Sequence, residues 1–108
     1  MHRLGYVHLD LKPDNILIEA TDLYEEASSK LVLIDFGISQ MFLDEVGSHV
    51  PLRNDVDFSG NIYYSSKHAF MYQTQSRRDD FISLAYLLAF LLNGHITWLP
   101  HKDRRDPK

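Results

Sequence analysis

Four polar side chains in this chain have types and spacing that suit chemistry. In the stretch VHLDLKPDNILI, Asp10 is followed by Lys12 and Asn15, and Asp35 follows the later run KLVLI. A carboxylate such as that of Asp10 can accept the proton of a hydroxyl group and orient its oxygen. The side-chain oxygens of Asn15 and Asp35 suit Mg²⁺, and Lys12 can reach a phosphoryl group as a point charge. Together they predict phosphoryl transfer to a hydroxyl.

Two short strands are expected to bring these side chains together. The segments Ile16–Glu19 and Lys30–Ile34 are rich in branched aliphatic residues, and the polar stretch ATDLYEEASSK between them reads as a surface loop. A hairpin of the two strands would return the chain so that Asp35 lies beside Asn15. A turn between Asp10 and the first strand would let Asn15 face the same cleft.

The segments that follow are expected to form a long loop and one helix. Glycine and proline interrupt any hydrophobic period from Asp44 to Asn61, and loops of that length are usually functional. The residues Arg78–Asn93 predict a helix, because acidic side chains suit its positive N-terminal end and Gly94 is a suitable stop.

The predicted helix contains the longest apolar run of the chain, FISLAYLLAFLL from Phe81 to Leu92. A membrane span takes roughly 18 to 20 residues, so this run favours a buried helix. It is apolar on nearly every face, which predicts that protein surrounds it, although 108 residues can hardly enclose it completely.

Composition excludes several classes of protein. A chain of 108 residues suits one small domain, and its net charge of −4 makes nucleic acid a poor first partner. The absence of cysteine rules out disulfides and thiolate metal sites. The histidines show no close metal-ligand pairing. We expect a reducing, intracellular location, either cytoplasmic or nuclear.

Each candidate residue also has a simpler structural explanation. Asp10 and Asp14 could cap local backbone, Asn15 could be a turn residue, and Asp35 could cap the end of a strand. Taken singly, these explanations would be preferred by about two to one, given how often such residues occur in turns. Their joint order, bridged by two strands, favours the catalytic interpretation.

Two motifs in order make the sequence resemble the eukaryotic protein kinases. The kinase catalytic loop has the pattern H-R-D-L-x-x-x-N and is followed downstream by D-F-G. Here the segment HLDLKPDN, which begins at His8, matches the first motif with one change. The tripeptide DFG occurs intact as Asp35–Gly37, immediately after a predicted strand. A DFG tripeptide alone would be a weak signal.

The resemblance implies a role for each residue. Asp10 is the expected catalytic base, Asn15 and Asp35 the expected ligands of Mg²⁺, and Lys12 the expected contact to the phosphates of ATP. Lys12 also favours serine or threonine as the acceptor. His8 is expected to be structural and to bond the backbone near the DFG turn.

Within the kinases, the sequence is similar to the casein kinase I family. LGYVHLDLKPDN looks like its catalytic loop, HVPLRNDVDFSGNIYYSS (His49–Ser66) like its activation segment, and QSRRDD (Gln75–Asp80) like its signature at the start of the large central helix. This implies that Asp80 anchors the catalytic-loop backbone. It also implies that Arg77 contributes to a site for anions or for a phosphate on the substrate. Arg77 could equally belong to a solvated helix entrance.

Several positions depart from the family pattern. Leu9 replaces the arginine that usually binds a phosphorylated activation loop, Asn61 stands where a threonine is usual near the base and lysine, and Ala85 replaces a helix glycine. Only seven residues precede His8, and no G-x-G occurs. We therefore expect residues 1–108 to be a partial kinase domain, without the N-lobe and the end of the C-lobe.

These observations predict an α+β fold, the partial C-lobe of a protein kinase. The predicted function is that of a serine/threonine kinase that uses ATP and Mg²⁺ and acts, in the complete domain, on proteins at acidic or pre-phosphorylated sites. The isolated chain is expected to be inactive. A pseudokinase or truncated interaction module, and a small-molecule phosphotransferase of kinase-like fold, are the alternatives. Neither a nucleic-acid partner nor a membrane span is expected.

Overall fold

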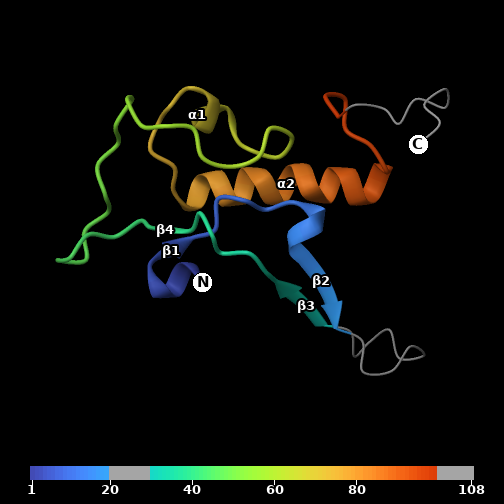
Figure 1. Ribbon diagram of the computed structural model, residues 1–108, viewed down its shortest axis with the longest axis horizontal. Helices are drawn as coiled ribbons and strands as arrows, with labels where there is room; N and C mark the ends of the chain where they lie inside the picture. Colours follow the sequence, from blue (N-terminus) through green and yellow to red (C-terminus); the bar gives the residue numbers. More distant parts are fainter. Residues whose placement is uncertain (20–29, 100–108) are drawn as a thin grey trace.

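The computed structural model describes residues 1–19 and 30–99, so the predicted surface loop between the first two strands lies outside the described residues. Figure 1 shows the chain arranged around one long helix. In chain order the elements are the 3₁₀ turn η1 (His2–Leu4), β1 (Tyr6–Val7), the 3₁₀ turn η2 (Pro13–Asn15), β2 (Ile16–Glu19), β3 (Lys30–Leu33), β4 (Gln40–Met41), α1 (Lys67–Phe70) and α2 (Arg77–Asn93). This α+β composition agrees with the predicted fold class.

The predicted hairpin is present. Strands β2 and β3 pair antiparallel, with Ile16 opposite Leu33. The second strand ends one residue earlier than predicted, yet the Ile34 N–H still donates to the Asn15 carbonyl at 2.9 Å. The hairpin projects from the body of the molecule in Figure 1. The end of the hairpin at Ile16 and Leu33 joins the body of the molecule, and it is next to the candidate site residues Asn15 and Asp35.

A second small sheet, which the sequence did not reveal, joins β1 to β4. The two strands pair antiparallel, with Tyr6 opposite Met41 and Val7 opposite Gln40. The β2–β3 hairpin and the turn after it bring these short strands together. This sheet fixes the segment before the catalytic loop to the segment after the DFG motif.

Helix α2 begins one residue earlier than predicted because Ser76 caps it. The Ser76 side chain and the Asp79 side chain form a capping box, in which each accepts the other's backbone N–H. The helix ends at Asn93, and Gly94 adopts a left-handed conformation (φ 71°) there, as expected of a glycine stop.

The buried core consists of two apolar clusters. One contains Val7, Leu9 and Phe42 and lies beside the small β1–β4 sheet. The other contains Tyr64, Leu87 and Ile96 and covers one side of α2. From residue 44 to 61 the chain has no helix or strand, as predicted for the long loop.

Protein covers α2 on one side, not all round as its composition suggested. The carboxylates of Asp79 and Asp80 are buried, whereas Leu91 and Leu92 are 62% and 84% exposed. In residues 1–19 and 30–99, no helix has the length and apolar character needed to cross a membrane.

Candidate functional site

Two amide side chains hold the carboxylate of Asp10. Asn61 Nδ2 donates to Asp10 Oδ1 at 3.0 Å, and Asn15 Nδ2 donates to Asp10 Oδ2 at 3.2 Å. Asn15 Nδ2 also donates to the Asp10 carbonyl at 2.8 Å. Each carboxylate oxygen keeps a lone pair with which it can accept a further proton. The Asp10 carboxylate is therefore held in one orientation by two neutral donors, as a predicted base would need.

Asn61 is itself held from its other end. Its Oδ1 accepts the backbone N–H groups of Tyr63 and Tyr64 at 3.2 and 2.7 Å, and its own N–H donates to the Ser65 hydroxyl at 3.0 Å. A rotation of the Asn61 amide group would break both bonds that its Oδ1 accepts. The activation segment therefore contacts the Asp10 carboxylate through one rigid side chain.

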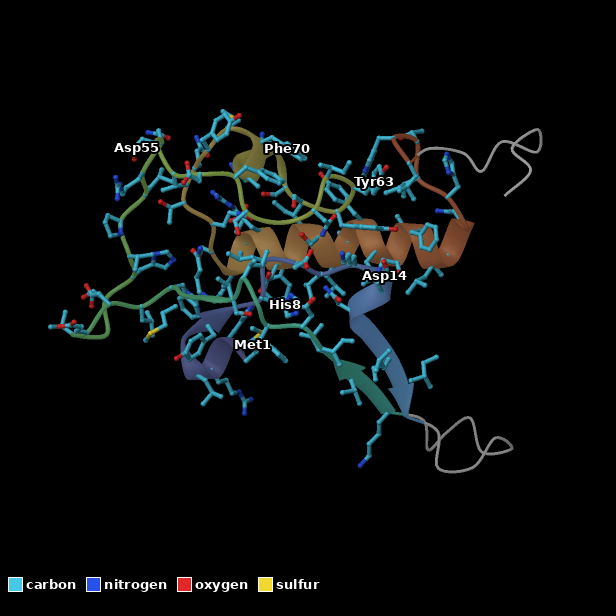
Figure 2. The ribbon with its side chains drawn as sticks, in the orientation of Figure 1. Met1, His8, Asp14, Asp55, Tyr63 and Phe70 are labelled. Carbon is cyan, nitrogen blue, oxygen red and sulfur yellow. The ribbon has the colours of Figure 1, made fainter. Side chains whose placement is uncertain are left out.

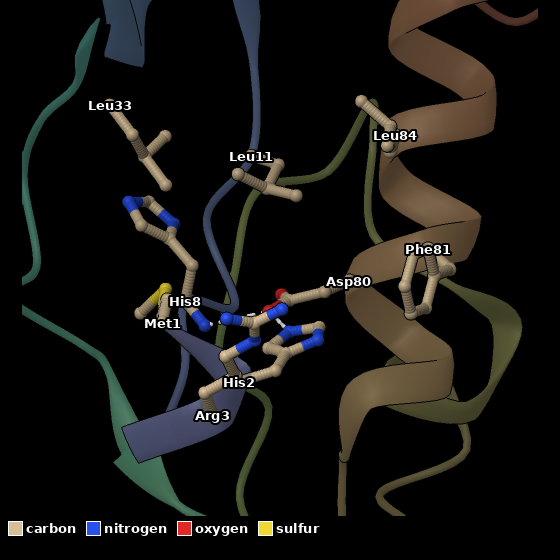
Figure 3. Close-up of a pocket in the computed structure, with 9 residues that line it drawn as sticks. All are labelled: Met1, His2, Arg3, His8, Leu11, Leu33, Asp80, Phe81 and Leu84. Atoms are coloured by element: carbon tan, nitrogen blue, oxygen red, sulfur yellow. Dashed lines mark hydrogen bonds and ion pairs between the residues drawn. The ribbon is translucent and has the colours of Figure 1, made fainter. Parts of the chain in front are cut away.

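Asp80 anchors the backbone that precedes Asp10. Its Oδ2 accepts the His8 N–H at 2.8 Å, and its Oδ1 accepts the Leu9 N–H at 2.9 Å. His2 Nε2 donates to Oδ2 at 2.9 Å, and Figure 3 shows this ring and the His8 backbone both beside the Asp80 carboxylate. Asp80 is 4% exposed, so all these bonds are largely shielded from water. They hold Leu9 in a left-handed conformation (φ 70°) that side chains other than glycine rarely adopt.

His8 ties the catalytic loop to the strand before the DFG motif. Its Nδ1 accepts the Asp10 N–H at 3.1 Å, so its Nε2 carries the hydrogen and donates to the Ile34 carbonyl at 2.9 Å. The ring also packs edge-on against Phe36. Figure 2 shows His8 in the interior of the molecule, where it is fully buried. This geometry suits a structural histidine, not a catalytic one.

Asn15 and Asp35 are the residues that could hold Mg²⁺. The Asn15 amide nitrogen is committed to Asp10, which leaves its oxygen as the ligand atom. Asp35 is exposed, and within residues 1–19 and 30–99 its side chain has one hydrogen bond, which Oδ1 accepts from the Gly37 N–H at 3.2 Å. These hard oxygen atoms fit Mg²⁺, which usually takes one or two protein ligands together with phosphates and waters. In the described ranges 1–19 and 30–99, no group of three or more His, Asp or Glu could hold a metal ion.

A cavity of about 770 Å³ lies beside Asn61, the residue that bonds to the Asp10 carboxylate. Lys12 and Asn61 line it together with aromatic side chains, including Tyr64 and Phe90. Burial, and to a lesser extent the Asp14 carboxylate, raises the pKa of Tyr64. The half-buried Lys12 thus lies where its ammonium group can meet a ligand close to Asp10.

Arg77 is placed differently from the other candidates. It begins α2, and its guanidinium carbon lies 4.5 Å from the centre of the Phe42 ring. The residue is exposed, so the guanidinium N–H groups remain open to solvent. The structure does not bring Arg77 into contact with Asp10 or Asn15.

Some functional contacts had no readable signal in the sequence. The resemblance predicted that Asn61 lies near the base, but it did not predict the hydrogen bond from Asn61 to the Asp10 carboxylate. His2 and Phe42 gave no signal, because their partners lie 78 and 35 residues away along the chain. Contacts at such separation depend on the complete fold.

Comparison with known proteins agrees with this geometry. The sequence model described as the protein kinase domain matches residues 1–107. The chain is 44% identical over 101 residues to casein kinase 1-like protein HD16 of Oryza sativa subsp. japonica. The matched region covers 91% of this chain and 14% of that relative, so the chain spans about one seventh of its length.

Proposed function

Because this chain belongs to the protein kinase family and has a casein kinase 1-like relative, we propose that the full-length protein transfers the γ-phosphate of ATP to serine or threonine side chains of proteins. The observation that carries this proposal is the Asp10 carboxylate, fixed between the amides of Asn15 and Asn61. General acid–base catalysis needs a base in one defined orientation.

In the proposed reaction, the substrate hydroxyl approaches Asp10 from the cavity beside Lys12. As the hydroxyl oxygen bonds to the γ-phosphorus, its proton passes to the Asp10 carboxylate and the bond to the ADP oxygen breaks. Lys12 places a positive charge near the transferring group. Bound Mg²⁺, held by Asn15 and Asp35, would neutralise phosphate charge.

The preference for acidic or pre-phosphorylated sites is a finer part of the proposal. Arg77 supports it, because its guanidinium is exposed at the N-terminal end of α2, where negative charge is also favoured by the helix dipole. The ring of Phe42 holds one face of the guanidinium in place, and its N–H groups can still donate to a carboxylate or a phosphate.

The test uses the full-length protein with labelled ATP, Mg²⁺ and three peptides that differ only in a serine, threonine or tyrosine acceptor, in acidic and neutral versions. We expect label on serine or threonine, with the acidic peptides preferred. Asp35→Ala should abolish Mg²⁺-dependent transfer. Asp55→Asn is the control, because Asp55 is exposed at the outer edge of the molecule in Figure 2 and, among the described residues, bonds with Arg53 alone.

Two results would contradict the proposal. Binding of ATP without transfer to any peptide would identify a non-catalytic relative of the kinases. Transfer that persists at the wild-type rate in Asp35→Ala would remove the assigned Mg²⁺ ligand. The 108 residues alone should transfer no phosphate, because positioning needs ATP enclosed between two lobes.

A further inference from the structure

Phe42 lies where the segment after the DFG motif meets the segment before the catalytic loop. Its side chain is 2% exposed and packs with Val7 and Leu9, which stand on either side of His8 in the sequence. Ile38 and Leu43 pack against the same cluster. We call the cluster of Val7, Leu9 and Phe42 the clamp. It joins the start of the activation segment directly to the loop that carries Asp10.

Backbone bonds fix Phe42 on both sides of the clamp. Its N–H donates to the Gly5 carbonyl at 2.9 Å, and its carbonyl accepts the Val50 N–H at 2.9 Å. The first bond continues the pairing of β1 with β4, and the second closes the turn of residues 43–49. Phe42 therefore connects the turn in the activation segment to the strand that leads into the catalytic loop.

Further groups enclose the rest of the Phe42 ring. The Arg77 guanidinium lies over its face, with 4.5 Å between the guanidinium carbon and the ring centre. The rings of His49 and His2 lie 5.9 and 6.2 Å away, measured between ring centres. His49 Nε2 is also bonded to the Ser76 hydroxyl at 2.7 Å. Through this ring, the activation segment, the catalytic loop and the start of α2 are packed as one unit.

The clamp depends on the departure of this chain at position 9. In kinases with arginine there, that side chain reaches a phosphate on the activation segment. Leu9 is 4% exposed and contributes apolar surface to Phe42 instead. The Leu9 backbone N–H is bonded to Asp80. Because Asp10 immediately follows Leu9, a displacement of Leu9 would also displace Asp10.

We propose that Phe42 is a positioning residue, which holds the catalytic loop against the activation segment through Leu9 and so fixes Asp10 for transfer. This rests on the proposed kinase function. Phe42 does not touch the reacting groups, so its loss should lower kcat while the KM for ATP changes little. A displacement of about 1 Å at a catalytic group can cost roughly 10²-fold in rate.

The experiment compares Phe42→Ala with Phe42→Leu and Leu87→Ala in the full-length protein. Phe42→Ala should lower kcat by roughly 10²-fold and speed hydrogen exchange at the amides of His8, Leu9 and Val50. Phe42→Leu keeps apolar contact with Leu9, so its kcat and its rate of amide exchange should both be close to those of the wild type. Leu87→Ala is the control, because Leu87 is equally buried but belongs to the other core cluster. It should lower the melting temperature without changing kcat or exchange at those amides.

The outcomes separate the clamp from the proposed function. If the wild-type protein transfers phosphate normally, and Phe42→Ala changes neither kcat nor amide exchange, the clamp is wrong and the kinase function stands. If no form transfers phosphate but Phe42→Ala still speeds exchange at His8 and Leu9, the coupling stands and the kinase function fails. Should Phe42→Ala not fold, Leu9→Ala removes the same contact from the other side and must lower kcat, or the proposal is overturned.

Discussion

The catalytic loop differs from the β2–β3 hairpin and α2 in how its side chains are satisfied. Around Asp10 and His8, polar groups are buried and bonded to partners from distant parts of the chain. In the described residues, no buried side-chain nitrogen or oxygen lacks a partner. The β2–β3 hairpin and α2 are the opposite, since large apolar side chains on more than one of their faces lie in solvent: Leu17, Ile18, Leu31, Leu88, Leu91 and Leu92.

This difference shows which part of the structure finds its bonding partners within the described residues. A buried polar group is costly unless it is paired, and the catalytic loop obtains all its pairs from residues of this chain. The exposed leucines near the end of α2 are large apolar side chains close together on one helix, and such groups suit further contact. The polar network around Asp10 is therefore satisfied by residues of this chain, whereas the large apolar side chains of the hairpin and α2 remain exposed.

The largest expected effect comes from Asp80, the anchor of the polar region. Asp80→Ala leaves the buried N–H groups of His8 and Leu9 without an acceptor, at about 1–3 kcal/mol each. Chemical denaturation of the full-length protein should show a loss of several kcal/mol, with activity lost as well. Asp79→Ala has a matched burial but removes the cap of α2 and the acceptor of the buried Ser66 hydroxyl, neither of which holds the catalytic loop, so it should lower stability with a smaller loss of activity. Equal losses of activity from both would contradict the special role of Asp80.

The next effect concerns how Asp10 is held. Asn61→Ala removes one donor to the Asp10 carboxylate and should lower kcat roughly 10-fold, less than a displacement that misaligns the whole loop. Asn54→Ala, an exposed asparagine of the same segment, is the control and should leave kcat unchanged. Steady-state kinetics at saturating ATP and peptide distinguish them. A normal kcat in Asn61→Ala would show that Asn15 alone orients Asp10.

Much of this site could be predicted from the sequence because its signals are local. The spacing from His8 to Asn15 and the DFG tripeptide place the chemistry beside a hairpin, and the hairpin follows from two short aliphatic runs. The protein kinase family and the casein kinase I resemblance were both confirmed. The roles assigned to Asp10, Lys12 and Arg77 remain predictions.

The parts that could not be predicted depend on packing between distant segments. Strands β1 and β4 are two residues each, too short to give a pattern, and they form because the hairpin returns the chain. The cap at Ser76 moved the start of α2 by one residue. The apolar period of α2 predicted burial, but it could not show how much protein would cover each face.

The exposed apolar side chains of the β2–β3 hairpin and α2 should be detectable in solution by dye binding and self-association. The 108-residue chain should bind a hydrophobic dye and self-associate, because large apolar side chains of the β2–β3 hairpin and α2 are exposed to solvent. Leu92→Lys should reduce dye binding. Val46→Lys changes a side chain that is equally exposed, at 84%, but lies in the turn of residues 43–49, and it should leave dye binding unchanged. A monomeric chain that melts sharply and reversibly and binds no dye would contradict this.

The smallest expected effect is that of removing phosphate. Position 9 of the catalytic loop is a leucine, so it offers no arginine to bind a phosphate on the activation segment. Leu9 instead packs against Phe42 in the clamp. Phosphatase treatment of the full-length protein should leave kcat unchanged. A loss of activity traced to Ser48, Ser59, Ser65 or Ser66 would show that the polar region needs a charge that the structure does not contain.

The most direct test of the central claim is the single-turnover rate of transfer in Asp10→Asn, measured in the full-length protein at saturating ATP, Mg²⁺ and peptide. Asparagine keeps the shape of the side chain but cannot take up the proton of the hydroxyl. We predict that the rate falls by roughly 10²-fold or more, the scale of a lost general base, while ATP still binds with wild-type affinity. A transfer rate in Asp10→Asn equal to that of the wild type would contradict the account, because the network around Asp10 would then hold a residue that the reaction does not use.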